Sequence, residues 1–168
     1  MKIRFRSKNM YFVKPIKKYA EFYTKNINDV EIYRWISSNP RKYTIEEERE
    51  WIKSIKDEPI YTIITKDKEI IGNISFNSIK NNVGTIGIWI TPSMHGKHYG
   101  REAIERTIKY GFQKMNMETI KIVVFENNIK AIKCYESVGF KKYRVQHNVK
   151  DGIGTITNNI YMKIERKR

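Results

Sequence analysis

The stretch TIGIWITPSMHGKHYGREAI, residues 85–104, carries the clearest fold signal in this chain. An apolar run ends at Pro92, the loop HGKHYG (95–100) holds two glycines four residues apart, and a helical pattern follows. Glycine-bearing loops between a strand and a helix often bind phosphate, because backbone N–H groups and the helix dipole both point at the ligand. The stretch therefore predicts a strand, a phosphate-binding loop and a helix. His98 lies between the two glycines, and this stretch alone does not tell which molecule's phosphate would bind.

The segments before this stretch are predicted to form strands. Two β-branched runs, 60–66 and 69–79, precede the apolar run 83–91. Polar turns at 66–68 and 80–82 separate them, which is typical of hairpins. We expect a three-stranded antiparallel meander.

The segments after the loop alternate between helix and strand. A helix over 100–115 leads to the strand TIKIVVF (119–125) and a second helix over 127–138. Two last strands are expected around FKKYRVQH and TITNNIYMKI. The connection from 85 to 125 is long enough for a right-handed parallel crossover.

The N-terminal part predicts one strand and two helices. MYFVKPI (10–16) reads as a strand ended by Pro15, and residues 17–37 are helix-like. Thr44 and Glu47 form a capping-box pattern that opens a helix to about Ile55. We expect a single domain over residues 1–168 with an α+β fold, in which a mixed, mostly antiparallel sheet contains one parallel pair.

Length and composition indicate an ordinary globular protein. The chain has 168 residues, enough to bury a proper core, and 40% of them are hydrophobic while 30% are charged. Its apolar runs are shorter than the roughly 20 residues of a membrane span, and we recognise no signal peptide. The single cysteine, Cys134, gives no internal disulfide and no multi-cysteine metal site. We therefore expect a cytoplasmic protein without a bound metal.

A formal net charge of +15 is the strongest compositional feature. Such a charge attracts nucleic acid, anionic membranes or anionic small molecules. The basic residues are spread from Lys2 to Arg168, however, and KKYR (141–144) is the only short stretch that mixes basic and aromatic residues. We interpret the charge mainly as compositional bias and do not expect nucleic acid or a membrane as a partner.

The helix in ENNIKAIKCYESVGF (126–140) presents one stripe of residues. Asn128, Ala131, Tyr135 and Val138 follow one another at helical spacing. A stripe of this kind usually faces a core, in which Tyr135 would simply pack. Gly139 reads as a helix C-cap.

Taken together, these segments resemble the GCN5-related N-acetyltransferase (GNAT) superfamily, in the branch of ribosomal-protein N-terminal and spermidine acetyltransferases. The resemblance covers nearly the whole chain. Its most specific part is the pattern N-x-x-A-I-x-x-Y-x-x-x-G-F in combination with the preceding loop. The matching stretches are YTIEEEREWI (43–52), IGNISF (71–76), residues 85–104, TIKIVVF, NNIKAIKCYESVGF (127–140) and, more weakly, DGIGTITNNIYMKI (151–164).

The resemblance implies acetyl-coenzyme A as the co-substrate and a parallel strand pair that splays to admit it. The backbone of Ile88, Trp89 and Ile90 would pair with the pantetheine arm, and Asn128 would line the opposite side. The family's loop is usually Q/R-x-x-G-x-G/A, so His95 replaces the Gln or Arg and His98 replaces a glycine. We expect His98 to keep the loop only with a negative φ. The implied pyrophosphate contacts are His95, Gly96, Lys97, His98, Tyr99, Gly100 and Arg101.

The resemblance also implies the chemistry. A primary amine would attack the thioester carbonyl directly in a ternary complex, with Tyr135 as the acid that protonates the departing sulfur, a role worth about 10²–10⁴ in rate. The base stays open. Many relatives carry a carboxylate early on the third meander strand, where this chain has Thr85; Glu126 or water are the alternatives.

Two rival functions and the identity of the acceptor also stay open. The chain could be a basic nucleic-acid-binding module, or a protein that binds coenzyme A without turnover. A polyamine acceptor suits a basic chain poorly, although EEERE (46–50) is locally acidic. A protein N-terminal amine, an aminoglycoside and an amino sugar on a nucleotide are further candidates, and a homodimer is the assembly that we keep open.

Overall fold

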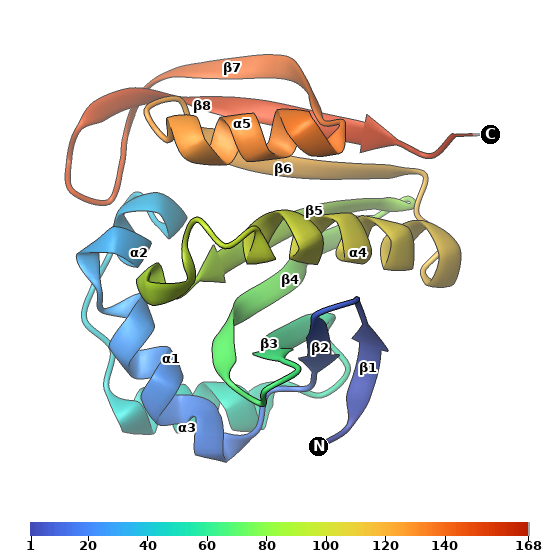
Figure 1. The fold of residues 1–168 in the computed structure, drawn as a ribbon. Coiled ribbons are helices and arrows are strands. Elements are labelled where there is room, and N and C mark those ends of the chain that lie inside the picture. Colours follow the sequence, from blue (N-terminus) through green and yellow to red (C-terminus); the bar gives the residue numbers. More distant parts are fainter. Residues whose placement is uncertain (168) are drawn as a thin grey trace.

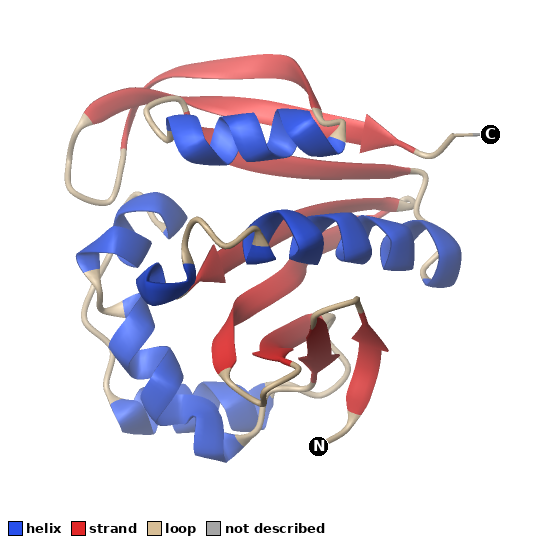
Figure 2. Cartoon of the chain, viewed as in Figure 1, coloured by secondary structure: helices blue, strands red, loops and turns tan. Residues whose placement is uncertain are grey.

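The computed structural model describes residues 1–167 as one eight-stranded sheet with helices against both faces (Figure 1). The strand order is β1-β2-β3-β4-β5-β6-β8-β7, and β5–β6 is the one parallel pair among the described strands. Figure 2 shows the helices grouped around the twisted sheet. The strands are β1 (Ile3–Arg6), β2 (Met10–Val13), β3 (Ile60–Thr65), β4 (Ile70–Lys80), β5 (Val83–Ile90), β6 (Thr119–Phe125), β7 (Lys141–Lys150) and β8 (Ile156–Glu165). The α-helices are α1 (Ala20–Ile27), α2 (Val30–Ile36), α3 (Ile45–Ser54), α4 (Tyr99–Lys114) and α5 (Ile129–Val138).

The predicted meander and crossover are confirmed. β3, β4 and β5 pair antiparallel in chain order, and α4 connects β5 to its parallel neighbour β6. One strand was missed, because the charged stretch IRFR of β1 carries a single buried residue, Phe5. That residue stacks on Phe12 of β2 at 4.3 Å between ring centroids. β1 is therefore held by one aromatic anchor, which a periodicity argument does not detect.

The parallel pair β5–β6 separates halfway along its length. Its pairing begins at Val83 with Thr119 and ends at Ile86 with Ile122. Beyond this point β5 continues to pair with β4 as far as Ile90, and β6 with β8 as far as Phe125. The register of β4 shifts between Phe76 and Ser78, opposite the last paired residues of β5. A bulge bends and twists its strand, so this irregularity accounts for the divergence of β5 from β6.

The segment predicted to be helix-like, residues 17–37, is helical but divided. It forms a short 3₁₀ turn (Lys17–Tyr19), then α1, then α2. The break falls at Asn28 and Asp29, where the Asp29 side chain accepts a hydrogen bond from Glu31 N–H and starts a new helix. Short polar side chains compete with the helical backbone in this way, which favours a cap over a continuous helix.

The core has two parts, one on each face of the sheet. Neighbouring residues alternate between them, since Phe12 and Ile63 pack with α4 and α5, while Val13 and Ile64 pack with α1 and α3. Isoleucine supplies most of the aliphatic packing, in keeping with a chain that has no leucine. Helices therefore cover both faces, as expected. None of the described helices is long and apolar enough to cross a membrane.

Candidate active site

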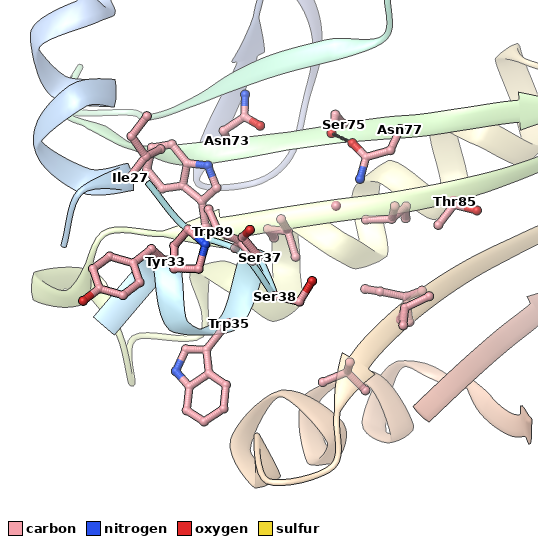
Figure 3. Close-up of a pocket in the computed structure, with 18 of the residues that line it drawn as sticks. Ile27, Tyr33, Trp35, Ser37, Ser38, Asn73, Ser75, Asn77, Thr85 and Trp89 are labelled. Atoms are coloured by element: carbon pink, nitrogen blue, oxygen red, sulfur yellow. Dashed lines mark hydrogen bonds between the residues drawn. The ribbon is translucent and has the colours of Figure 1, made fainter. Parts of the chain in front are cut away.

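A cavity of about 920 Å³ lies where β5 and β6 diverge. Figure 3 shows that its wall combines side chains from β4 and β5 with others from α1, α2 and the segment after α2. β6 and α5 close the remaining side. The residues labelled in Figure 3 are Asn73, Ser75, Asn77, Thr85 and Trp89 from the strands, and Ile27, Tyr33, Trp35, Ser37 and Ser38 from the helical side.

The end of β5 presents an open backbone edge to this cavity. Residues 87–90 pair with β4 on one side and have no strand partner on the side of β6. Trp89 lies on the sheet face covered by α1 and α3, 5.8 Å from Phe22 and 5.5 Å from Tyr23 between ring centroids. Of the predicted strand residues, Ile88 and Trp89 line the cavity and Ile90 belongs to the core beside α4. The groups that residues 87–90 present to a ligand are therefore their unpaired backbone N–H and C=O groups.

The loop after β5 is braced by a histidine. Nε2 of His95 lies 2.6 Å from the carbonyl oxygen of Ile90, and because a carbonyl can only accept, His95 donates this hydrogen bond. Gly96 has φ +76°, in the left-handed region that glycine enters without strain. His95, which stands where the resemblance has Gln or Arg, therefore holds the loop against the end of the strand.

The expectation of a negative φ for His98 is wrong. His98 has φ +64° and is the N-cap of α4, where its side chain makes no capping hydrogen bond. Histidine is among the residues that enter the left-handed region more often than most, so the loop geometry survives without glycine. The exposed His98 ring is left free to approach a ligand.

The first turn of α4 is shaped like an anion site. Its leading N–H groups receive no side-chain cap, and the first backbone bond of the turn is from Glu102 N–H to His98 C=O, 3.1 Å. A Cβ on Gly100 would meet only Ile90 Cγ1, at 3.9 Å, so no packing inside the chain requires glycine there. The missing side chain leaves a hollow against the helix N-terminus. The backbone of this turn therefore leaves free N–H groups and open space, the features of an anion site.

Three further loop residues have partners of their own. Lys97 Nζ lies 3.6 Å from Met94 Sδ, and Arg101 Nε donates to Glu105 at 2.9 Å. Tyr99 is half-buried against the core. Lys97 and Arg101 are exposed, so both keep enough freedom to turn toward an anion.

Asn128 caps α5. Its side-chain oxygen accepts a hydrogen bond from the backbone N–H of Ala131, 3.4 Å, and the residue also lines the cavity. This capping role was not foreseen. It fixes the start of the helix that carries Tyr135.

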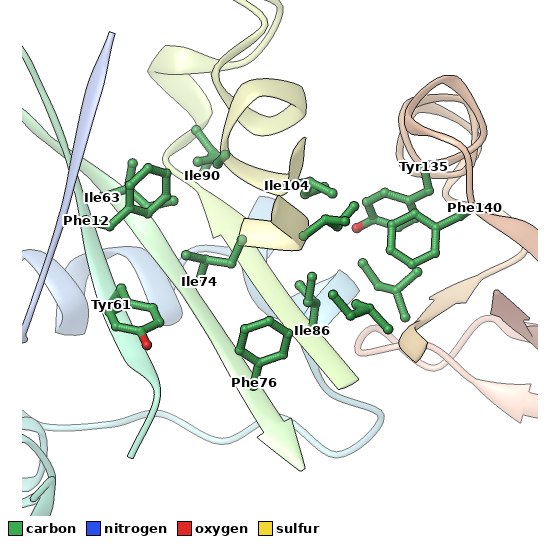
Figure 4. Packing of buried hydrophobic residues seen from close by; sticks show 14 of the residues in the cluster. Phe12, Tyr61, Ile63, Ile74, Phe76, Ile86, Ile90, Ile104, Tyr135 and Phe140 are labelled. Atoms are coloured by element: carbon green, nitrogen blue, oxygen red, sulfur yellow. The ribbon is translucent and has the colours of Figure 1, made fainter. Parts of the chain in front are cut away.

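Tyr135 is buried in the core and borders the cavity. It is 9% exposed and packs edge-on against Phe140, with 6.1 Å between ring centroids. Figure 4 shows its ring reaching from α5 toward α4, with the hydroxyl at the far end. Burial raises the pKa of Tyr135, and its hydroxyl makes no hydrogen bond to any residue of the described chain. The hydroxyl is therefore protonated at neutral pH and has a proton to donate.

Neither Glu126 nor the Thr85 position offers a well-placed base. Glu126 is exposed, accepts a hydrogen bond from Asn158 Nδ2 at 2.6 Å, and is not among the cavity-lining residues. Thr85 lines the cavity but carries no group that accepts a proton near neutral pH. A carboxylate that we did not single out, Glu48 of α3, lies in the cavity wall instead. The sequence could have indicated Glu48. Residues 45, 48, 52 and 55 share one helix face, and Glu48 is the one charged residue among three isoleucines.

A buried aspartate holds the helical wall of the cavity in position. Asp151, 1% exposed, pairs with Arg34 of α2 at 3.1 Å and accepts from Asn127 Nδ2 at 3.0 Å. Gly152 N–H donates to Arg34 C=O at 2.9 Å, and a Cβ on Gly152 would lie 2.5 Å from Tyr33 C=O. The β7–β8 loop therefore locks onto α2 and onto the residue before the cap of α5.

Replacing Asp151 with Asn should lower the free energy of unfolding by about 2–3 kcal/mol at pH 7, because charge-assisted hydrogen bonds to a buried group are lost. Burial opposes the ionisation of Asp151, but hydrogen bonds from Asn127, Thr155, Ile153 and Arg34 outweigh it and lower its pKa. A lowered pKa adds stability above the ordinary value of 3.8, and this stability is lost as the pH falls through the folded-state pKa. Urea unfolding from pH 7 to 3 should show the difference between wild type and variant shrinking. A constant difference would contradict the ionic role.

The fold and site define a class: proteins with a splayed parallel strand pair, an anion-binding turn beside it and a tyrosine at its opening. The sequence profile of the acetyltransferase (GNAT) domain matches residues 11–141, and the chain belongs to this family.

Curated relatives agree with this assignment. Acetyltransferase PseH of Campylobacter jejuni subsp. jejuni serotype O:23/36 is 32% identical over 83 residues, 49% of this chain and 52% of that protein. The chain thus spans about half the length of this relative. An uncharacterized N-acetyltransferase, p20, of Bacillus licheniformis is 28% identical over 145 residues, 80% of each chain.

Solved structures share the fold along nearly the whole chain. A GNAT-family acetyltransferase from Bacillus anthracis has a TM-score of 0.84 at 20% identity, covering 98% of both chains. The microcin C7 self-immunity acetyltransferase MccE, solved with acetyl-CoA and AMP, has a TM-score of 0.78 at 21% identity, covering 95% of this chain and 94% of its own. Spermidine N-acetyltransferase from Vibrio cholerae, solved with CoA and spermine, has a TM-score of 0.82 at 21% identity, covering 95% and 96%.

Proposed function

We propose that residues 1–168 form one acetyltransferase domain that moves an acetyl group from acetyl-coenzyme A to a primary amine. The observation that carries this proposal is the open edge of residues 87–90, which leads at one end to the uncapped first turn of α4 and borders the cavity that Tyr135 also lines. The neighbours solved with acetyl-CoA or CoA support the same co-substrate.

The chain's own groups divide the work of binding. The unpaired backbone of β5 takes up an extended, amide-bearing arm in the way that a sheet edge takes up another strand. The N–H groups of the first turn of α4, with Gly96 and Gly100 beside them, hold the pyrophosphate. Lys97, His98 and Arg101 surround this point with donors.

The reaction then needs few side chains. Acetyl-coenzyme A supplies a thioester, whose carbonyl carbon is attacked by the neutral amine. A backbone N–H of residues 88–90 stabilises the developing oxyanion, as fixed N–H donors do in acyl transfer. Tyr135 gives its proton to the departing sulfur, so that the products are an amide and a free thiol.

An acetylation screen tests the proposal. Purified protein with acetyl-coenzyme A is offered polyamines, aminoglycosides, dipeptides with free N-termini and nucleotide-linked amino sugars, and thiol release is measured above the rate without acceptor. We expect at least one class to be acetylated. Calorimetry in the absence of an acceptor measures binding of acetyl-coenzyme A alone. A protein that binds acetyl-coenzyme A in this experiment but releases no thiol in the screen would be the rival that has no turnover. Absence of binding at millimolar acetyl-coenzyme A would end the proposal itself.

The nucleic-acid rival has one surface in its favour. On the sheet face of β6, β7 and β8, Lys121 and Lys163 lie 5.4 and 5.8 Å from the ring of Tyr143. Aromatic and basic groups in such proximity can bind single strands. Salt-sensitive oligonucleotide binding with no response to acetyl-coenzyme A would favour this rival. A cytoplasmic location and the oligomeric state stay predictions.

A further inference from the structure

Glu48 occupies a buried position on α3, on a helix face whose other buried residues are apolar. Residues 48, 52 and 55 lie on the face that turns toward the molecule, and Ile52 and Ile55 are 4% and 6% exposed. Glu48 itself is only 5% exposed, whereas the other three glutamates of this helix are exposed. Carboxylates are almost never buried to this extent unless they are paired.

Glu48 has no such pair. Glu47, next in the chain, accepts hydrogen bonds from Arg41 at 2.9 Å and from Thr44 N–H at 2.8 Å, so the cation whose charge acts on Glu48 is bonded to Glu47. Within residues 1–167, the Glu48 side chain has neither an ion-pair nor a hydrogen-bond partner, and its backbone N–H donates to Thr44 C=O at 3.1 Å. Burial and the charge of Glu47 raise its pKa, while the charge of Arg41 lowers it in part. The side chain is largely removed from water, and its oxygens are not among the fully buried unpaired atoms of the described chain, so they border the cavity. A carboxylate so placed without a partner costs stability, and packing does not explain this residue.

The surroundings of Glu48 suit an organic cation. Tyr23 of α1, which Glu48 influences electrostatically, is hydrogen-bonded to Asn73 of β4 at 2.9 Å. Asn73 lies opposite Trp89 in the sheet register, at the open edge of β5. Tyr23, Trp51 and Trp89 line the same cavity as Glu48, and Tyr23 lies 5.7 Å from Trp51. Aromatic faces and a carboxylate together attract an ammonium group.

We propose that Glu48 binds the ammonium group of the acceptor and removes its proton before acetyl transfer. The proposal rests on the proposed function. It names the residue that accepts the proton of the amine in the same cavity. The step is balanced: R–NH₃⁺ and the Glu48 carboxylate give R–NH₂ and the Glu48 carboxylic acid. The amine then attacks, and Glu48 returns its proton to solvent. No covalent bond to the protein forms.

Glu48→Gln is the test, because it keeps shape and removes the charge. We expect kcat/KM for the accepted amine to fall about 100-fold or more, with acetyl-coenzyme A affinity within twofold of wild type. The acid limb of kcat/KM, which lies above the ordinary carboxyl value of 4.5 in wild type, should vanish. Glu50→Gln, an exposed change of equal charge on the same helix, is the matched control and should leave both quantities unchanged.

Thermal stability separates this role from a structural one. A raised pKa means that Glu48 favours the fold when protonated, and this contribution is lost as the pH rises through the folded-state pKa. Glu48→Gln should therefore raise Tm by about 2–4 °C at pH 7 and change it little at pH 4. A Tm below that of wild type at pH 7 would mean that Glu48 stabilises the fold, and would overturn the proposal.

A binding measurement keeps the outcome independent of turnover. Spermine, kanamycin and alanylalanine amide serve as probes, and the rise in Tm at millimolar concentration is compared between wild type and Glu48→Gln. Thiol release that is unchanged in the variant overturns the proposal and leaves the proposed function standing. An amine that stabilises wild type alone, without thiol release, supports ammonium binding by Glu48 but rejects the transferase and with it the proton-transfer role of Glu48. If no amine stabilises wild type and none is acetylated, both proposals fail.

Discussion

Tyr135→Phe is expected to lower kcat by roughly 100-fold or more, because the departing thiolate loses its proton donor. The hydroxyl is the only atom removed, and it has no hydrogen-bond partner in the described chain. The ring keeps its packing against Phe140. Fold stability and acetyl-coenzyme A affinity should therefore both survive.

The measurement requires conditions in which chemistry limits the rate. Single-turnover mixing of the acetyl-coenzyme A complex with an active acceptor provides them, since slow product release would hide the loss. Tyr143→Phe, which removes an exposed hydroxyl far from the cavity lining, is a suitable control. A single-turnover rate within about threefold of wild type would assign proton donation to water or to another group.

Gly100→Asp is expected to weaken acetyl-coenzyme A binding by at least about 100-fold. The new carboxylate would stand in the hollow at the first turn of α4, and juxtaposed like charges cost several kcal/mol. The protein itself has room for the side chain, because the nearest atom to a new Cβ is Ile90 Cγ1 at 3.9 Å. An acidic residue in a first helical turn also interacts favourably with the helix dipole, so Tm without ligand should hold or rise.

Gly100→Asn separates charge from bulk. It adds a side chain of the same size without the negative charge, so we expect an intermediate loss of affinity. Calorimetry on the three proteins at fixed ionic strength gives the comparison. Equal loss in Asn and Asp variants would indicate steric blockage, and unchanged affinity in both would place the pyrophosphate elsewhere.

The parts of this fold that follow from local periodicity could be predicted from the sequence. β6 lies where the apolar run TIKIVVF indicated, and α3 begins at the capping box of Thr44 and Glu47, both of whose hydrogen bonds are present. Gly139 ends α5 with φ +111°, as its position suggested. These features depend on residues close together in the chain.

The remaining features depend on contacts between distant segments. β1 forms because Phe5 finds Phe12 and Tyr110, the latter at 4.2 Å, and the sequence of β1 alone gives no sign of this. Asp151 reads as one residue of a weak motif until the fold sets it beside Arg34 and Asn127. His98 adopts a positive φ because the brace at His95 and the start of α4 fix both ends of a short loop. The predicted contacts of residues 88–90, 95–101 and 128 with coenzyme stay predictions.

The gap between β5 and β6 would couple the stability of the fold to the proposed co-substrate. Residues 87–90 leave backbone hydrogen-bonding groups unmatched, and an unmatched sheet edge invites pairing with another chain. A co-substrate that completes the ladder would act as a removable strand. By mass action, its presence at 100 times Kd would add about 2.7 kcal/mol to stability. The lifetime of the folded protein would then follow the supply of acetyl-coenzyme A, with the ligand-free form the first to self-associate when that supply falls.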